Sequence, residues 1–260
     1  MTTQPCQYIR LHTDGRLATV QLHRPAARNA LSVALMRELT AVALALAERT
    51  DIDAVIVTGD ATCFTAGADL KDRAAWSDES LPLVQRRENA AVGWKLCKAW
   101  EELPQVSIVA IEGYAVGGGL ALAVACDWRV MADNAFVSLP EIALGIPLTW
   151  GAIPRLTALV GPSRAKRLTI LCERLGAADA LAMGLVDHVT PPGGALAKAT
   201  DLAQQVLAMP AAAVRMSKAT ANAVATAGHL AAGHMALDQL MLAGASAESV
   251  AARAAALKRR

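Results

Sequence analysis

The chain has 260 residues, of which 54% are hydrophobic and 18% charged, and its formal net charge is +2. This length allows one large domain, or a domain with an appendage. So small a net charge does not indicate a nucleic-acid partner. The most apolar run, residues 113–126, is shorter than the roughly 20 residues that a membrane-spanning helix needs, so we expect no membrane partner either.

The cysteines and the N-terminus bear on the compartment. The first residues contain no cationic stretch followed by an apolar one, so no secretory signal is visible. The chain has five cysteines, an odd number without C-x-x-C spacing, which favours reduced thiols over disulfides or a zinc site. We therefore expect a cytoplasmic protein.

The first third of the chain predicts a hairpin, a helix and a buried strand. Residues 7–23 contain two β-leaning runs separated by Asp14-Gly15, which is typical of a hairpin turn. Residues 32–48 show apolar positions at helical spacing, with Ser32 as the expected N-cap. The apolar run 54–58 lacks alternation, which predicts a strand covered on both faces.

The middle of the chain repeats this alternation of helix and strand. We expect a helical stretch near residues 79–102, a strand over 106–111 and, after a glycine-rich turn, a helix over 119–126. Short strands are predicted at 128–131 and 136–138. Strands that alternate with helices indicate a mostly parallel sheet.

The pattern becomes almost wholly helical after residue 160. Gly161-Pro162 is expected to start a helix, Gly176 to separate it from the next, and residues 191–194 to form the clearest break. The last part predicts four helices, over residues 195–208, 210–227, 229–243 and 246–258. We expect an α/β body over 1–192 and a C-terminal helical extension over 193–260 that packs on this body or on another subunit.

Two glycine-containing segments carry the strongest functional signal. Gly117-Gly118-Gly119 precedes a helix of small residues, and Gly67 lies within the segment 64–71. Each segment leaves backbone N–H groups accessible beside a turn. Two such groups directed at one point would form an oxyanion hole for a carbonyl oxygen that gains negative charge.

An ordered set of motifs resembles the crotonase family, the enoyl-CoA hydratases and isomerases. The motifs follow the order and spacing of that family from about residue 8 to about residue 255. They are Asn29-Ala30-Leu31, Phe64-x-Ala66-Gly67-Ala68-Asp69-Leu70-Lys71, Gly113-Tyr114-Ala115-Val116-Gly117-Gly118-Gly119, Pro140-Glu141-x-x-x-Gly145, Arg155-Leu156 and Ala182-x-Gly184-Leu185-Val186.

The resemblance implies a fold and an assembly. It implies an α/β, crotonase-like fold of repeated ββα units in two nearly perpendicular sheets, with a C-terminal helical trimerisation region. The expected assembly is a homotrimer, or a hexamer formed as a dimer of trimers. The implied substrate is an acyl-CoA thioester, and no cofactor is expected because coenzyme A is part of that substrate.

The resemblance also assigns expected roles to single residues. The oxyanion donors would be the backbone N–H groups of Ala68 and Gly118, and the adenine would lie near Ala66. The segment from Ala68 through Asp69 and Leu70 to Lys71 would line the substrate.

The carboxylates separate the reactions of the family. Its hydratases place two glutamates across one water molecule, one in the Pro-Glu element and one two residues after the glycine triplet. Here the first is Glu141, but the second position is Ala121, whose methyl group cannot move a proton. Isomerases of the family that use one glutamate keep it in the Pro-Glu element, which Glu141 matches. An apolar pocket would raise the pKa of Glu141.

Several residues near these motifs have two open interpretations. Trp150 and Leu148 are bulkier than is usual in the hydratases, and either reshape the acyl cavity or belong to the core. Arg28 and Lys71 either pair with the phosphates of coenzyme A or are solvated surface charges. Asp69 is interpreted as a helix N-cap rather than an acid catalyst.

Three functional hypotheses follow. The first is isomerisation of a 3-enoyl-CoA to a 2-enoyl-CoA with Glu141 as the single base. The second is hydration of a 2-enoyl-CoA with a single glutamate, or another crotonase-type reaction. The third is an acyl-CoA binding protein without catalysis. The acyl group and the pathway are not encoded in any motif, and no H-E-x-x-H, G-x-S-x-G or G-x-x-x-x-G-K pattern occurs that would indicate metal, serine or P-loop chemistry.

Overall fold

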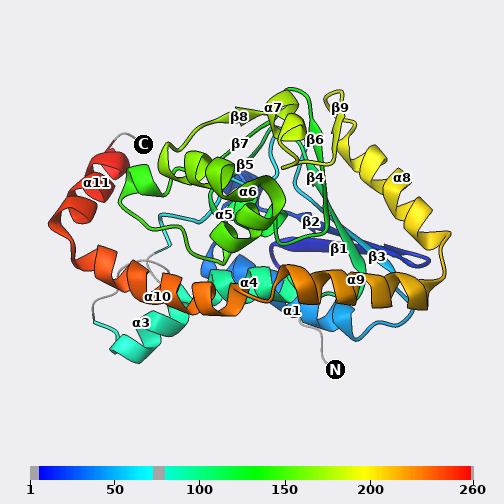
Figure 1. Cartoon of the computed structure of the whole chain (residues 1–260), viewed down its shortest axis with the longest axis horizontal. Coiled ribbons are helices and arrows are strands. Elements are labelled where there is room, and N and C mark those ends of the chain that lie inside the picture. Colours follow the sequence, from blue (N-terminus) through cyan, green and yellow to red (C-terminus); the bar gives the residue numbers. More distant parts are fainter. Residues whose placement is uncertain (1–5, 73–79, 259–260) are drawn as a thin grey trace.

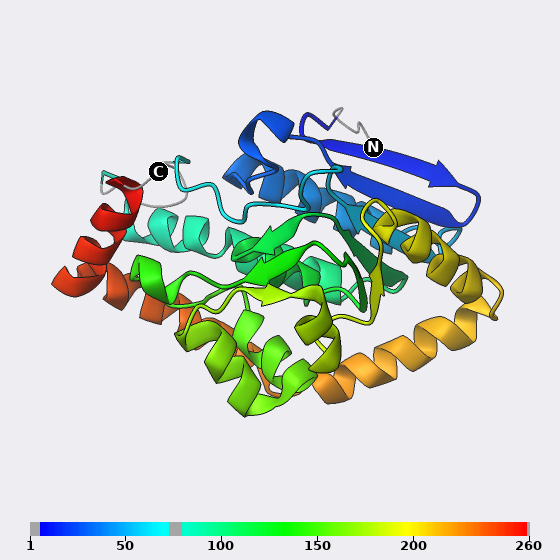
Figure 2. The ribbon, with the colours of Figure 1, turned by 90° about the horizontal axis from the view of Figure 1, so that it is seen from above.

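The computed structural model describes residues 6–72 and 80–258, which form two β-sheets surrounded by helices (Figures 1 and 2). The larger sheet has six strands in the order β1-β2-β3-β4-β6-β9, and the smaller sheet has the order β5-β7-β8. The strands of the larger sheet are β1 Ile9–Asp14, β2 Leu17–Leu22, β3 Ala54–Thr58, β4 Val106–Ile111, β6 Trp128–Ala132 and β9 His188–Thr190. Those of the smaller sheet are β5 Tyr114–Val116, β7 Phe136–Ser138 and β8 Leu175–Gly176.

The larger sheet is parallel except for its first hairpin. Strands β1 and β2 pair antiparallel, whereas β2, β3, β4, β6 and β9 pair parallel. Every residue of β3 and of β4 is buried, as their unbroken apolar runs predict. The predicted mixed α/β fold is therefore confirmed.

The helices cover both faces of the larger sheet. One core cluster joins α1 and α4 to side chains such as Val55 and Val109, and a second joins α8 to Ile56 and Ile108 on the opposite face. The described helices are α1 Val33–Ala47, α3 Leu83–Ala90, α4 Val92–Glu101, α5 Gly118–Ala123, α6 Ala152–Ile170, α7 Ala177–Ala182, α8 Ala195–Leu207, α9 Ala211–Ala225, α10 His229–Ala245 and α11 Ala247–Lys258, with short 3₁₀ turns η1 Pro25–Ala27 and η2 Ile142–Leu144. None of the described helices is both long and apolar enough to cross a bilayer.

The four C-terminal helices run from one end of the molecule to the other (Figure 1). Helix α8 packs its small residues on the sheet, whereas α9 has no fully buried residue. Polar contacts attach α9 instead: Lys218 Nζ donates to Asp127 Oδ2 at 2.6 Å, and Asn222 Nδ2 donates to the carbonyl of Glu101 at 2.9 Å. The helical extension is thus partly built into the sheet core, and a domain boundary at residue 192 stays a prediction.

The structure differs from the sequence-based expectations at several element boundaries. The expected helix over 79–102 is two helices that meet at Ala91, within the described residues from 80 onward. Helix α6 consists of two helical segments that meet at a kink at the non-helical Gly161, where φ is 78°, so a segment begins after Gly161 as expected and an additional segment precedes it. The short strands β5, β8 and β9 were not expected, although β7, which also has three residues, was.

Candidate active site

Three neighbouring chain segments direct their carboxyl ends to one point. Strand β5 pairs parallel with β7 on one side and bridges Thr65 on the other. The N–H of Val116 donates to the carbonyl of Thr65 at 3.2 Å, and the N–H of Gly117 donates to that of Ser138 at 2.8 Å. Parallel segments end at the same edge of a sheet, so the residues that follow them meet there. A cavity of about 30 Å³ at this edge is lined by Ala68, Gly118, Ala121, Glu141, Ile146, Pro147, Leu148, Thr149 and Trp150.

The backbone around Ala68 leaves its own N–H unused. Ala68 forms a parallel bridge with Leu31, in which the Leu31 N–H donates to the Gly67 carbonyl and the Asp69 N–H donates to the Leu31 carbonyl. This pairing uses the Gly67 carbonyl and the Asp69 N–H, which flank Ala68, and the N–H of Ala68 itself points away from Leu31. Within the described residues no backbone hydrogen bond involves that N–H, so it is available to a ligand.

Gly118 presents a second unused N–H. It is the first residue of α5, where the preceding turn offers no carbonyl partner, and no described backbone carbonyl accepts from it. The preceding Gly117 has φ 55° and ψ −120°, a conformation that favours glycine. A Cβ atom at Gly117 would lie 2.6 Å from Glu141 Oε1, and one at Gly118 would lie 2.3 Å from Cζ3 of Trp150. Glycine is therefore required at both positions by close approach of the neighbouring side chains.

The carboxyl group of Glu141 is buried beside these glycines. As a whole the residue is half-buried, but its Oε2 atom is covered and accepts no hydrogen bond from any described group. Burial raises the pKa of Glu141 from 4.5 to about 7, and an interaction with its own backbone N–H opposes this only weakly. A carboxyl group with a pKa near neutrality can both take and return a proton.

Among the described residues that line the cavity, one side chain is acidic. Ala121 lies on α5, is buried, and lines the same cavity as Glu141. Among the described lining residues Glu141 alone is acidic, and Thr149 is the only hydroxyl-bearing residue. The site therefore offers one proton-moving carboxyl group and two unused amides, surrounded mostly by apolar side chains.

Two polar residues fix the segment that carries Ala68: Asn29, which belongs to a motif of the sequence, and Thr65, which sequence reasoning did not single out. The buried Asn29 donates from Nδ2 to the carbonyl of Phe64 at 3.3 Å. The Thr65 hydroxyl donates to the Asn29 carbonyl at 2.6 Å and accepts from the Gly67 N–H at 3.1 Å. The methyl group of Thr65 also packs on Gly119, where a Cβ atom would lie only 2.4 Å away. In the sequence, the motif Asn29-Ala30-Leu31 was the sign of these hydrogen bonds that fix the segment.

A buried ion pair holds the turn that carries Trp150. Arg155 donates from Nε and Nη2 to the two carboxylate oxygens of Glu101, both at 2.7 Å. Its Nη1 donates to the carbonyl of Trp150 at 2.8 Å. Trp150 has a positive φ of 60°, which is uncommon for a bulky residue, so this clamp stabilises an otherwise unfavourable turn. Trp150 both lines the cavity and belongs to the main core cluster, so its position fits both interpretations of the sequence.

Asp69 caps a turn rather than a described helix. Its Oδ1 accepts from the N–H of Lys71 at 3.0 Å, and its Oδ2 accepts from Arg24 Nη1 at 2.6 Å. No described helix begins at residues 70–72, and the chain from 73 to 79 lies outside the described residues. The interpretation of Asp69 as a helix N-cap is therefore corrected to a side chain that caps a local turn and pairs with Arg24.

The other expected substrate-binding residues lie outside the small cavity. Ala66 and Leu70 are half-buried, and Arg28 and Lys71 are exposed. None of these four is among the described residues that line the cavity.

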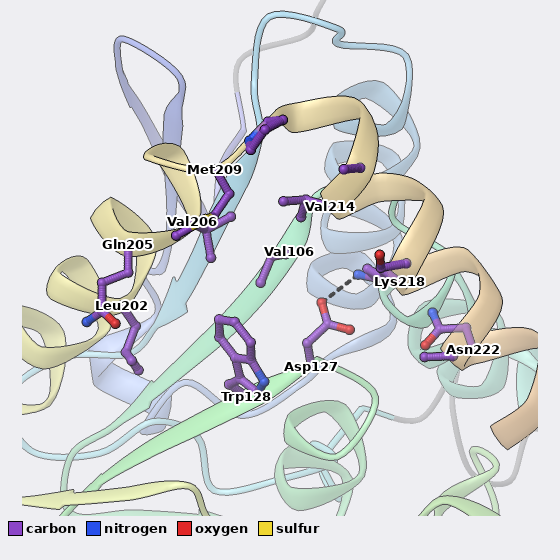
Figure 3. Close-up of a pocket in the computed structure, with 14 residues that line it drawn as sticks. Val106, Asp127, Trp128, Leu202, Gln205, Val206, Met209, Val214, Lys218 and Asn222 are labelled. Atoms are coloured by element: carbon purple, nitrogen blue, oxygen red, sulfur yellow. Dashed lines mark hydrogen bonds and ion pairs between the residues drawn. The ribbon is translucent and has the colours of Figure 1, made fainter.

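A larger cavity, of about 690 Å³, lies elsewhere, between α8, α9 and the sheet (Figure 3). Its described lining is mainly apolar and includes Trp128, Val206 and Met209, and its Asp127 is paired with Lys218. It shares no described residue with the cavity at Glu141. No group of three potential metal-ligating side chains gathers in the part of the chain that the structure describes.

Comparisons with known proteins agree with this arrangement. The family model described as enoyl-CoA hydratase/isomerase matches residues 12–252. A crotonyl-CoA hydratase from Syntrophomonas wolfei is 35% identical over 213 residues, which cover 82% of this chain and 80% of that protein. A short-chain-enoyl-CoA hydratase from Clostridium acetobutylicum is 32% identical with the same coverage.

Solved structures show the same fold. An enoyl-CoA hydratase from Mycobacterium avium subsp. paratuberculosis superposes with a TM-score of 0.87 at 26% identity, covering 98% of both chains. An enoyl-CoA hydratase from Bacillus anthracis superposes with a TM-score of 0.78 at 33% identity, covering 91% of this chain and 90% of that one. The chain therefore belongs to the enoyl-CoA hydratase/isomerase family, also called the crotonase family, and has the crotonase fold with a C-terminal helical region.

Proposed function

We propose that this enzyme binds an acyl-CoA thioester and converts a 3-enoyl-CoA to a 2-enoyl-CoA, with Glu141 as its only base. The observation that carries the proposal is the composition of the small cavity. It combines one buried carboxyl group with the unused N–H groups of Ala68 and Gly118, while Ala121 provides no second carboxylate. A single carboxyl group is sufficient for a proton shift between two carbon atoms.

The first step would be removal of a proton from C2 of the substrate. The Glu141 carboxylate takes this proton, and the electron pair of the broken C–H bond is delocalised over the diene and onto the thioester oxygen. The N–H groups of Ala68 and Gly118 would donate to that oxygen. A donor of this kind contributes about 3 kcal/mol to transition-state stabilisation.

The second step would return the same proton to C4. The protonated Glu141 donates it, the C2–C3 double bond forms, and the thioester carbonyl is restored. The reaction moves one proton and one double bond and consumes no water. The pKa of Glu141, raised by burial to about 7, suits a group that acts first as a base and then as an acid near neutral pH.

The remaining substrate contacts are proposed from the positions of the family motifs. The adenine would lie near Ala66, the segment Ala68, Asp69, Leu70 and Lys71 would line the ligand, and Arg28 and Lys71 would pair with its phosphates. Coenzyme A is then part of the substrate, and no separate cofactor is required.

We also propose a homotrimer, or a hexamer built from two trimers, assembled through residues 193–260. Large apolar side chains on the C-terminal helices support this, because Met216, Val224 and Leu242 are each at least 70% exposed in the single chain. A cytoplasmic location is supported by the five cysteines, all of which are free thiols.

A second candidate reaction is hydration of a 2-enoyl-CoA with Glu141 alone. The names of the relatives, a crotonyl-CoA hydratase and a short-chain-enoyl-CoA hydratase, favour it. Ala121 argues against it, because a buried methyl group cannot hold or activate the attacking water.

The test is to supply the enzyme with 3-enoyl-CoA and 2-enoyl-CoA esters of equal chain length and to follow both products by NMR. The proposal predicts that isomerisation has the larger kcat/KM. Faster hydration would refute it in favour of the hydratase. Binding of both esters without turnover of either would instead support a non-catalytic acyl-CoA binding protein.

A further inference from the structure

The indole of Trp150 lies against Gly118, and the residue lines the same cavity as Ala68 and Glu141. A Cβ atom built on Gly118 would lie 2.3 Å from Cζ3 and 2.5 Å from Cη2 of the indole. A Cβ atom built on Gly93 of α4 would lie 1.9 Å from Cε2 and 2.2 Å from Nε1 of the same ring. The ring thus lies between the backbones of two helices and contacts both at positions that have no side chain.

This placement leaves little free volume next to Glu141. The cavity measures about 30 Å³, whereas an apolar cavity of about 150 Å³ is needed to hold a benzene molecule. Its free space is therefore close to that of one water molecule or one methyl group. The side chains of Leu148 and Ile146 are buried on the same side and leave no additional room.

The indole is also held firmly in place. The carbonyl of Trp150 accepts a hydrogen bond from Arg155, which is paired with Glu101 in the protein interior. Only 9% of Trp150 is exposed. The clamp fixes the backbone from which the ring projects, and the ring itself is confined by its close contacts with Gly93 of α4 and Gly118 of α5.

We propose that Trp150 determines substrate specificity by closing the acyl cavity, so that the enzyme accepts short acyl groups and excludes long ones. This inference rests on the proposed binding of an acyl-CoA thioester but not on which reaction follows. Gly93 contributes to this closure of the cavity, because the absence of a side chain at that position allows the indole to pack directly against α4.

The test measures binding of two saturated thioesters that neither candidate reaction can consume, butyryl-CoA and octanoyl-CoA. Each buried methylene strengthens binding by about fourfold where room exists, so four of them give about 200-fold. The ratio of Kd for butyryl-CoA to Kd for octanoyl-CoA should be about 1 or less in the parent. In Trp150→Ala it should rise at least tenfold, and Trp150→Leu should give an intermediate value.

Trp100→Leu is the matched control, because Trp100 is a fully buried tryptophan of the same helix layer that does not line the cavity. It should leave the ratio unchanged. A parent ratio well above 10, or a ratio that Trp150→Ala does not change, would overturn the inference. A Trp100→Leu ratio that rises as much as that of Trp150→Leu would also overturn it.

A second measurement tests the ring position without any ligand. Gly93→Ala should lower the Tm of the parent, since its Cβ would meet the indole, and should have little effect in the Trp150→Ala background. Equal effects in both backgrounds would contradict the proposed packing. Failure of the parent to bind either thioester would refute the substrate class itself, whereas the expected ratios without any isomerisation would refute only the proposed reaction.

Discussion

The buried carboxyl group of Glu141 should make the stability of the protein depend on pH in an unusual direction. Its pKa rises from 4.5 to about 7 on folding because burial disfavours the charged form. Between these values the native state keeps a proton that the unfolded state has lost, so the free energy of unfolding falls as pH rises. At 1.36 kcal/mol per pKa unit, the shift corresponds to about 3 kcal/mol, which is present below pH 4.5 and lost above pH 7.

The perturbation that isolates this effect is Glu141→Gln, which keeps the shape of the side chain but cannot ionise. Urea unfolding of parent and variant at about pH 5 and pH 8, at one protein concentration, gives the difference between their free energies of unfolding. That difference should move by about 2.5 kcal/mol in favour of the variant between the two pH values, because part of the full effect lies below pH 5. Glu48→Gln, at an exposed position, is the control and should show little change. Parallel pH dependences for the parent and Glu141→Gln would refute the reasoning.

Three further predictions follow from the site. The kcat/KM for a 3-enoyl-CoA should rise with pH through about 7, because the base acts deprotonated; a flat profile across this range would contradict this. Ala121→Glu alone should not increase hydration of a 2-enoyl-CoA, because the added carboxymethyl group exceeds the small cavity. Ala121→Glu combined with Trp150→Ala should increase the hydration rate by about 10²–10⁴-fold. The same increase from Ala121→Glu alone would count against the packing described. Arg155→Met should lower the free energy of unfolding, measured by urea titration, by about 3–5 kcal/mol, because it removes the guanidinium partner of the mostly buried Glu101. A decrease below about 1 kcal/mol would disprove the clamp.

The regular part of the fold could be predicted from the sequence because its signals are local. The apolar runs that form β3 and β4 lack alternation, and the structure buries both strands on both faces. Ser32 was expected to cap the first helix, and its hydroxyl accepts a hydrogen bond from the Leu35 N–H. The C-terminal helices lie within a few residues of their predicted ranges.

The short elements could not be predicted, because tertiary contacts define them. Strand β5 has three residues and exists because β7 and the segment at Thr65 pair with it on either side. Helix α6, by contrast, is interrupted at Gly161, and its second segment starts at Pro162, as local propensity predicts. Packing was decisive for β5 and not for this helix start.

The residues of the candidate site also divide into those that the sequence indicated and those whose positions depend on tertiary contacts. Motif spacing indicated Glu141, Ala68 and Gly118, and the structure brings all three to one cavity. The sequence left open whether Trp150 reshapes the acyl cavity or belongs to the core, because its position depends on contact with Gly93 in a distant helix. A glycine within a predicted helix was the only available sign of such a close approach.

The central claim is that a single carboxyl group moves a proton of a thioester held by two backbone amides. The most direct test is the rate of conversion of a short 3-enoyl-CoA to the 2-enoyl-CoA by the parent and by Glu141→Gln, with binding of the substrate measured for both. The account predicts that Glu141→Gln binds the thioester as the parent does but converts it at least about 10²-fold more slowly. Equal rates in the two proteins would contradict the account.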